Sequence, residues 1–179
     1  IEDIKKDGAI KIDNSKQINT RKKVLDIEQK VRDIIKKSQA VIPEGSQLEI
    51  SHHYGFENYY KFGLSMIVII NKTYCKKYLF LLQNQKHPAH CHKKKKETFL
   101  ILFGEIELNI ILNKKKKKKI MKPGEMFTIE PGTSHEFKAL SLAGTVIEEI
   151  STESIRSDSY YLDDRISKNR NRKSFISFY

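Results

Sequence analysis

The chain has 179 residues, enough for one well-buried domain with or without an N-terminal extension. Lys and Arg number 34 against 22 Asp and Glu, which gives a formal net charge of +12. Ten of the lysines lie in two uninterrupted runs, 93–96 and 114–119, between apolar segments where turns belong. Because a charge run is ordinarily a solvated loop, we ascribe the excess charge to lysine usage and expect no nucleic-acid partner.

The cysteines and the apolar segments bear on the compartment. Cys75 and Cys91 form neither a disulfide framework nor a CxxC motif, which favours a reducing, cytoplasmic environment. No stretch approaches 18 consecutive apolar residues and no signal-peptide pattern is present, so we expect no membrane association. Because the chain starts at Ile1 without methionine, we expect it to be a piece of a longer polypeptide.

The N-terminal region, residues 1–45, is predicted to be an arm followed by a helix. Residues 1–20 are polar with scattered isoleucines, as in an arm or a short strand. From about residue 20 to 38 apolar residues recur at helical spacing and charged residues occupy the other face, which predicts one amphipathic helix. Residues 43–46 then break the chain, and a short strand follows at 48–50.

Residues 51–63 are dense in aromatic and polar side chains. His52 and His53 are adjacent, so on a strand they face opposite ways and cannot both join one metal site. Packed or hydrogen-bonded histidines are the more ordinary case. We therefore expect a lid or an interface segment here.

From residue 64 onward the pattern is β to nearly the end. Short apolar or alternating segments separated by Gly, Pro and Asn turns predict strands at 64–70, 77–82, 99–103, 105–110, 126–129, 137–140 and 145–150. Regular short strands of this kind favour an antiparallel sandwich or barrel. We expect one such β-domain over residues 46–167, followed by a basic tail, 168–179, that is solvated or contacts a neighbouring chain.

A candidate metal site follows from the histidine spacing. His90 and His92 point the same way on an extended segment, Glu97 opens the next apolar segment, and a third imidazole appears at His135. Three imidazoles and one carboxylate suit a divalent ion such as Mn, Fe, Co, Ni or Zn, with room for water or substrate. His87 has neither the motif position nor the reach, and we expect it in a loop.

The two motifs resemble those of the cupin superfamily. The pattern HxH, four residues, Glu, six residues, Gly is followed by G-x6-PG-x2-H, with Glu130 and Ala139 where proline and asparagine are frequent in the family. This resemblance implies an all-β jelly-roll barrel (double-stranded β-helix), here with an N-terminal amphipathic helix. It also implies a metal on the four residues above, and pairing into a homodimer.

Segments 77–90, 147–152 and 163–166 are similar to the D-lyxose isomerase family of cupins. In that family a lysine thirteen residues before the first motif histidine and a glutamate just before a Ser/Thr pair lie beside the metal, at the positions of Lys77 and Glu149. Strand alternation alone allows either Glu148 or Glu149 to face the metal, and the resemblance favours Glu149. Asp163 and Arg165 either bind substrate hydroxyls or pin the tail through an ion pair.

Segments 49–55, 74–77 and 87–88 are also similar to the cupin domain at the C-terminus of sialic-acid-synthase-like proteins. That resemblance implies a synthase domain upstream and a role in sialic acid biosynthesis, with a sugar or sugar acid as ligand. Neither Glu149 nor Lys77 would then need to be catalytic.

Three functions follow as hypotheses. The first is a metal-dependent carbohydrate isomerase with Glu149 as base and Lys77 stabilising an enediolate oxygen, or an epimerase-like enzyme acting on a sugar acid or nucleotide sugar. The second is a non-catalytic sugar-binding domain, and the third is a structural dimerisation domain. An open, polar pocket beside the metal favours the first two, whereas a pocket filled by Phe99, Phe137 and their neighbours favours the third.

Overall fold

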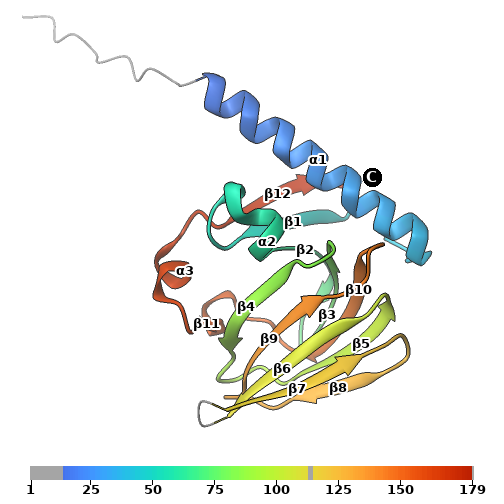
Figure 1. The fold of residues 1–179 in the computed structure, drawn as a ribbon, viewed down its shortest axis with the longest axis vertical. Helices are drawn as coiled ribbons and strands as arrows, with labels where there is room; N and C mark the ends of the chain where they lie inside the picture. The colour runs from blue at the N-terminus through green and yellow to red at the C-terminus, as the bar shows by residue number, and fades with distance from the viewer. Residues whose placement is uncertain (1–13, 113–114, 179) are drawn as a thin grey trace, which may run out of the picture.

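The computed structural model describes residues 14–112 and 115–178 and shows one β-body with a long helix across one end (Figure 1). The helix is α1 (Asn14–Ser38), and shorter helices are α2 (Tyr59–Phe62) and α3 (Asp164–Lys168). The predicted arm over residues 1–13 lies outside the described residues, whereas residues 14–20, also predicted as arm or strand, already belong to α1.

Two antiparallel sheets form the body. The larger sheet has seven strands in the order β12 (Lys173–Ser177), β1 (Gln47–His52), β2 (Gly63–Asn71), β3 (Tyr74–Leu81), β10 (Thr145–Thr152), β5 (Glu97–Phe103) and β8 (Met126–Ile129). The smaller sheet has five, in the order β11 (Tyr160–Tyr161), β4 (Lys86–Cys91), β9 (Ser134–Ala139), β6 (Ile106–Leu112) and β7 (Lys115–Met121). The predicted all-β jelly roll with an N-terminal helix is confirmed.

The larger sheet is covered on both faces because side chains alternate along its strands. In β3, Leu79 and Leu81 join the core between the two sheets, and Phe80 between them joins a second core under α1. Ile27 and Val31 of α1 fill that second core and are fully buried. Burying an aliphatic side chain of this size stabilises the fold by about 1.5–3 kcal/mol, so packing against the sheet holds the helix in place.

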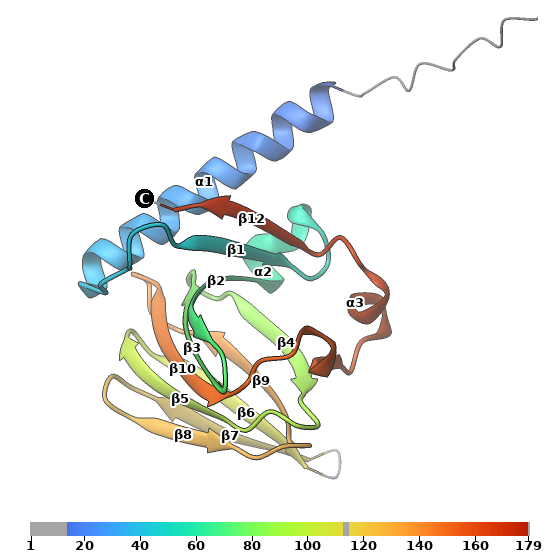
Figure 2. The same cartoon turned by 180° about the vertical axis from the view of Figure 1, so that it is seen from behind.

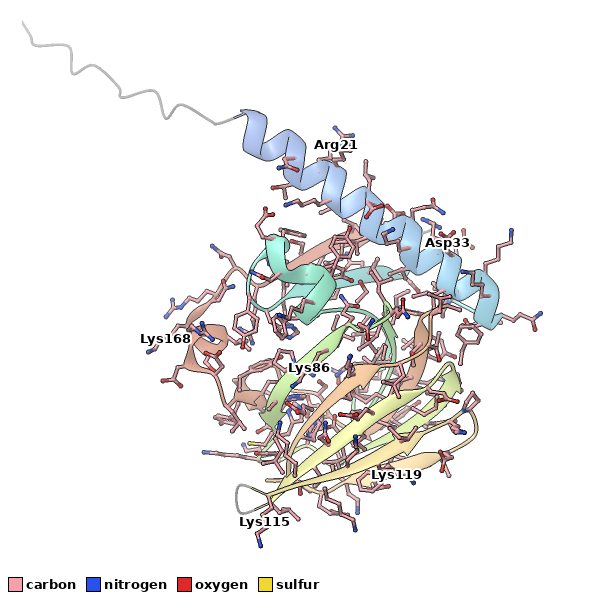
Figure 3. The ribbon with its side chains drawn as sticks, in the orientation of Figure 1. Arg21, Asp33, Lys86, Lys115, Lys119 and Lys168 are labelled. Carbon is pink, nitrogen blue, oxygen red and sulfur yellow. The ribbon has the colours of Figure 1, made fainter. Side chains whose placement is uncertain are left out.

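The described part of the second lysine run, residues 115–119, lies in a strand, contrary to the prediction of a solvated turn. Residues 115–121 form β7 and pair with β6 along its whole length, and Lys115 and Lys119 lie on this outer edge (Figure 3). β6 needs a neighbouring strand on this side. The backbone of β7 supplies the pairing, which does not depend on the side chains that β7 carries. Lysines on an edge strand also prevent further strands from adding to the sheet.

The C-terminal segment was predicted as a basic tail, and this is wrong for residues 173–178. β12 pairs with β1 at the edge of the larger sheet, beside α1 (Figure 2), and Phe178 is buried. Five of the six residues of β1 are buried, so an open edge there would expose an apolar strand. None of the helices in the described part of the chain is long and apolar enough to cross a lipid bilayer.

Candidate metal centre and its cavity

Four side chains from both sheets meet between them. His90 ends β4 and pairs in register with His135 of β9, His92 follows β4 directly, and Glu97 begins β5 in the opposite sheet. All four are buried, and one potential ligand atom from each lies within 4.8 Å of the others. The structure therefore brings together the four residues that the sequence predicts as metal ligands.

Backbone carbonyls fix the orientation of the three imidazoles. The Nδ1 atoms of His90, His92 and His135 lie 3.0, 2.7 and 3.1 Å from the carbonyl oxygens of Pro88, Asp158 and Thr133. Because a carbonyl oxygen only accepts, each Nδ1 carries the proton and each Nε2 is left with a lone pair. That tautomer is the one in which Nε2 binds a metal.

Two buried atoms at the centre have no hydrogen-bond partner, namely His135 Nε2 and Glu97 Oε1, which lie 3.0 Å apart. Two acceptors at this distance repel unless a cation lies beside them. Burial lowers the pKa of His90 well below its usual range, which keeps that imidazole neutral. Burial raises the pKa of Glu97, but its contacts with His135 and the Lys95 ammonium outweigh this effect and hold the pKa well below the usual range. Neutral imidazoles and a charged carboxylate fit a divalent cation.

Glu149 faces the same cavity from β10. It pairs in register with Lys77 of β3, and its Oε1 atom accepts a hydrogen bond from Lys77 Nζ at 3.0 Å. Glu148 points to the other face and pairs with Lys76. Burial raises the pKa of Glu149, but the Lys95 and Lys77 ammonium groups outweigh it, so the pKa is lowered and the carboxylate is charged.

Lys95 is a member of the site that sequence reasoning missed. Its side chain is 5% exposed although it lies in a run predicted to be a solvated turn. Lys95 Nζ contacts Glu97 Oε2 and lies 2.8 Å from Glu149 Oε1, so it joins the two carboxylates. The signal that would have identified it is its spacing of two residues from Glu97, which places both on one face of an extended segment.

Asp158 holds the backbone that carries Lys95. Its carboxylate accepts hydrogen bonds, each 3.0 Å long, from the N–H groups of Lys93, Lys94 and Lys95. Its own carbonyl oxygen accepts from His92 Nδ1. One residue outside both sheets thus orients a predicted metal ligand and the turn beside it.

We expect Asp158→Asn to lower the free energy of unfolding by about 1–3 kcal/mol, because charge-assisted hydrogen bonds from three backbone N–H groups are weakened. Burial raises the pKa of Asp158, but these N–H groups outweigh it and lower the pKa. A depressed folded-state pKa stabilises the fold above the unfolded value of about 3.9, and this contribution is lost as the pH falls through the folded-state pKa. Urea unfolding of both proteins at pH 7 and pH 3 measures the difference, which should shrink at pH 3. The exposed Asp164→Asn is the control, and an equal loss there contradicts the expectation.

The cavity beside the cluster has a volume of about 80 Å³, which is room for several water molecules. Phe99 and Phe137 form part of its wall but do not fill it. Polar residues form much of the rest, namely Ser51, Lys77, His87, Lys95, Glu149, Ser154, Ser159, Tyr161, Arg172 and Lys173. An open polar cavity of this kind favours a catalytic or sugar-binding role over a purely structural one.

The other histidines surround the cluster without joining it. His87, predicted in a loop, lies in β4, is buried, and stacks on Phe137 with ring centres 4.9 Å apart. Its Nδ1 atom is buried without a hydrogen-bond partner. His53 is bonded to the Phe62 carbonyl and to the Tyr161 hydroxyl, and His52 stacks on a neighbouring ring. Both are packed or hydrogen-bonded, as expected.

Asp163 and Arg165 are not among the described residues that line the cavity. Their side chains pair with each other at 2.7 Å, and Tyr54 donates a hydrogen bond to Asp163 at the same distance. Asp163 also caps α3 by accepting from the Arg165 N–H. This placement matches the alternative in which the pair pins the C-terminal segment.

Known proteins resemble this chain in sequence. The family model described as "Cupin domain" matches residues 79–147, a range that contains the four clustered residues. The chain is 29% identical over 174 residues to a D-lyxose/D-mannose isomerase of Thermosediminibacter oceani, covering 83% of this chain and 95% of the relative. It is 29% identical over 149 residues to a D-lyxose ketol-isomerase of a Thermofilum species, covering 70% and 82%.

Solved structures with low sequence identity share the architecture. The L-ribose isomerase of Geodermatophilus obscurus superposes with a TM-score of 0.68 at 12% identity, covering 86% of this chain and 97% of that one. The L-ribose isomerase of an Acinetobacter species in complex with L-ribose gives 0.68 at 14% identity, covering 83% and 94%. The match to the cupin domain model thus contains the four clustered residues, and the two-sheet barrel around them has the fold of these solved structures.

Proposed function

We propose that the chain is a metal-dependent aldose–ketose isomerase that acts on a carbohydrate, with a D-lyxose-like aldose as the first substrate to test. The observation that carries the proposal is the position of Glu149, a charged carboxylate in the same cavity as the His90, His92, Glu97 and His135 cluster. The isomerase names of the curated relatives support the reaction class.

Aldose–ketose isomerisation moves a proton between C1 and C2 of an open-chain sugar. A divalent ion held by the three imidazoles and Glu97 would polarise the carbonyl and the neighbouring hydroxyl. Glu149 removes the proton from C2, which leaves an enediolate, and returns it to C1, while the hydroxyl proton passes from O2 to O1. One carboxylate thus serves as base and then as acid.

Two lysines beside Glu149 adjust this chemistry in opposite directions. The ammonium groups of Lys77 and Lys95 lower the pKa of Glu149, which makes it a weaker base. The same positive charges stabilise the enediolate as negative charge develops on oxygen. In a buried site the second effect favours the reaction because the ammonium groups are already in place before the charge forms.

The metal ion, the oligomeric state and the compartment are part of the proposal. The donor set suits Mn, Fe, Co, Ni or Zn, since nitrogen and carboxylate ligands bind all of these ions. A homodimer in the cytoplasm, with a small-molecule sugar as partner, stays a prediction from the sequence. So does fusion to an upstream synthase domain.

We expect the purified protein to bind about one divalent ion and to convert D-lyxose or D-mannose to the ketose in its presence. Elemental analysis measures the ion, and a ketose assay over D-lyxose, D-mannose and L-ribose, with each of the five ions added to stripped protein, measures turnover. Stoichiometric metal with no turnover of any of these sugars or of their terminal phosphates contradicts the isomerase proposal.

One observation favours a second candidate, an accessory sugar-binding domain. Lys95 and Lys77 already neutralise Glu97 and Glu149, and a binding site does not need either carboxylate free. Sugar binding without turnover in the experiment above, detected by calorimetry, would support this candidate.

A further inference from the structure

Arg172 is a cation of the cavity wall that the proposed chemistry does not use. Arg172 lies just before β12, and its carbonyl oxygen accepts a hydrogen bond from the His52 N–H at 2.7 Å, which places the residue beside β1. Pairing of the last strand with the larger sheet thereby brings an arginine from the C-terminal segment to the cavity.

Arg172 differs from the other cations of this wall in having no carboxylate partner among the described residues. Lys77 and Lys95 pair with Glu149, and Lys173 pairs with Glu49. The Arg172 guanidinium donates through Nη1 to the Asn169 carbonyl at 3.3 Å, and its Nε is buried without a partner. A buried guanidinium donor left unbonded is costly, and an anion relieves that cost most effectively.

Tyr161 links Arg172 to the candidate metal centre. The guanidinium carbon lies 5.4 Å from the centre of the Tyr161 ring, and that ring stacks on His90 with centres 5.3 Å apart. The Tyr161 ring therefore contacts both Arg172 and one of the predicted ligands. A substrate whose C1 and C2 atoms lie at the metal centre can reach Arg172 only with a group at the other end of its extended chain.

We propose that the substrate is an anionic sugar whose phosphate or carboxylate group, at the end remote from C1 and C2, is bound by Arg172. This inference rests on the proposed function for the reacting end of the sugar. The guanidinium presents a planar set of N–H donors that matches the oxygens of a carboxylate or a phosphate. Neutral pentoses would leave the Arg172 Nε donor without an anionic partner.

The test uses binding probes without a carbonyl group, so that its result does not depend on turnover. We expect sorbitol 6-phosphate, or L-gulonate with its carboxylate at the C6 end of the corresponding sugar, to bind at least about tenfold more tightly than sorbitol in calorimetric titrations of the protein. Comparison of the two anionic probes shows whether phosphate or carboxylate is preferred, and inorganic phosphate alone should bind more weakly than sorbitol 6-phosphate.

Arg172→Gln should reduce the affinity for the anionic probe to that for sorbitol, and Arg172→Lys should restore part of it. Arg170→Gln removes the same charge from an exposed position two residues away and should leave the affinities unchanged. Equal affinity of the native protein for all three probes, or equal losses in Arg172→Gln and Arg170→Gln, overturns the inference. Turnover of neutral D-lyxose as efficient as that of its 5-phosphate also overturns it while leaving the isomerase proposal standing.

Discussion

Glu149→Gln is expected to lower kcat for isomerisation by about 10²–10⁴-fold while the bound metal is retained, because proton transfer by a positioned carboxylate contributes about that much. The amide is nearly the same size and still accepts hydrogen bonds from Lys77 and Lys95, which donate to Oε1 of the carboxylate. It has no charge and cannot take the C2 proton. The measurement is ketose formation together with elemental analysis of the same sample.

Glu148→Gln is the matched control. It makes the same chemical change one residue earlier on β10, where the side chain points to the other face and pairs with Lys76. Near-normal turnover is expected, since a partly exposed ion pair of this kind contributes little. Unchanged turnover in Glu149→Gln would remove Glu149 as the base, whereas an equal loss in both variants would indicate a general effect on the sheet.

His135→Ala is expected to abolish stoichiometric metal binding and, with it, activity. Its ring lies at the centre of the cluster, fully buried, with Nε2 3.0 Å from Glu97 Oε1. A ligand that binds only the folded state at 100 times its Kd stabilises the protein by about 2.7 kcal/mol. Added Mn or Zn should therefore raise the Tm of the native protein and leave that of His135→Ala unchanged, in thermal scans of stripped protein.

His87→Gln tests whether any buried histidine would give the same result. His87 is buried in the same region and packs edge-on against His90 with ring centres 4.4 Å apart, but it is outside the four-residue cluster. We expect this variant to bind about one metal ion and to keep the metal-dependent rise in Tm. A His135→Ala protein that retains its metal would exclude the proposed centre.

Local sequence patterns were sufficient to predict the elements that follow from strand alternation and helical spacing. The run 105–110 alternates polar and apolar residues and β6 forms over 106–112, and the apolar spacing in residues 20–38 lies within α1. His90, His92, Glu97 and His135 were predictable as a group because motif spacing on paired strands fixes their relative positions.

Other features depended on tertiary pairing, which a single sequence does not display. Lys95 and Lys94 are chemically identical neighbours, and both donate a backbone hydrogen bond to Asp158. Only Lys95 is buried, because its ammonium group pairs with Glu97 and Glu149. Lysines are poor strand formers in isolation, yet residues 115–119 form a strand because β6 offers an unpaired edge. Alternation along the strand shows that Glu148 and Glu149 face opposite sides but not which of them faces the cavity. The pairing of β10 with β3 decides this.

The pairing of β12 with β1 joins elements from opposite ends of the chain. During synthesis β1 leaves the ribosome well before β12, so its outer edge stays open until the residues of β12 have been made. Contacts between such distant segments close slowly and expose intermediates to association with other chains. Until that last strand docks, α1 is the element already available to shield the nascent barrel, since it precedes β1 in the chain and packs over the same core.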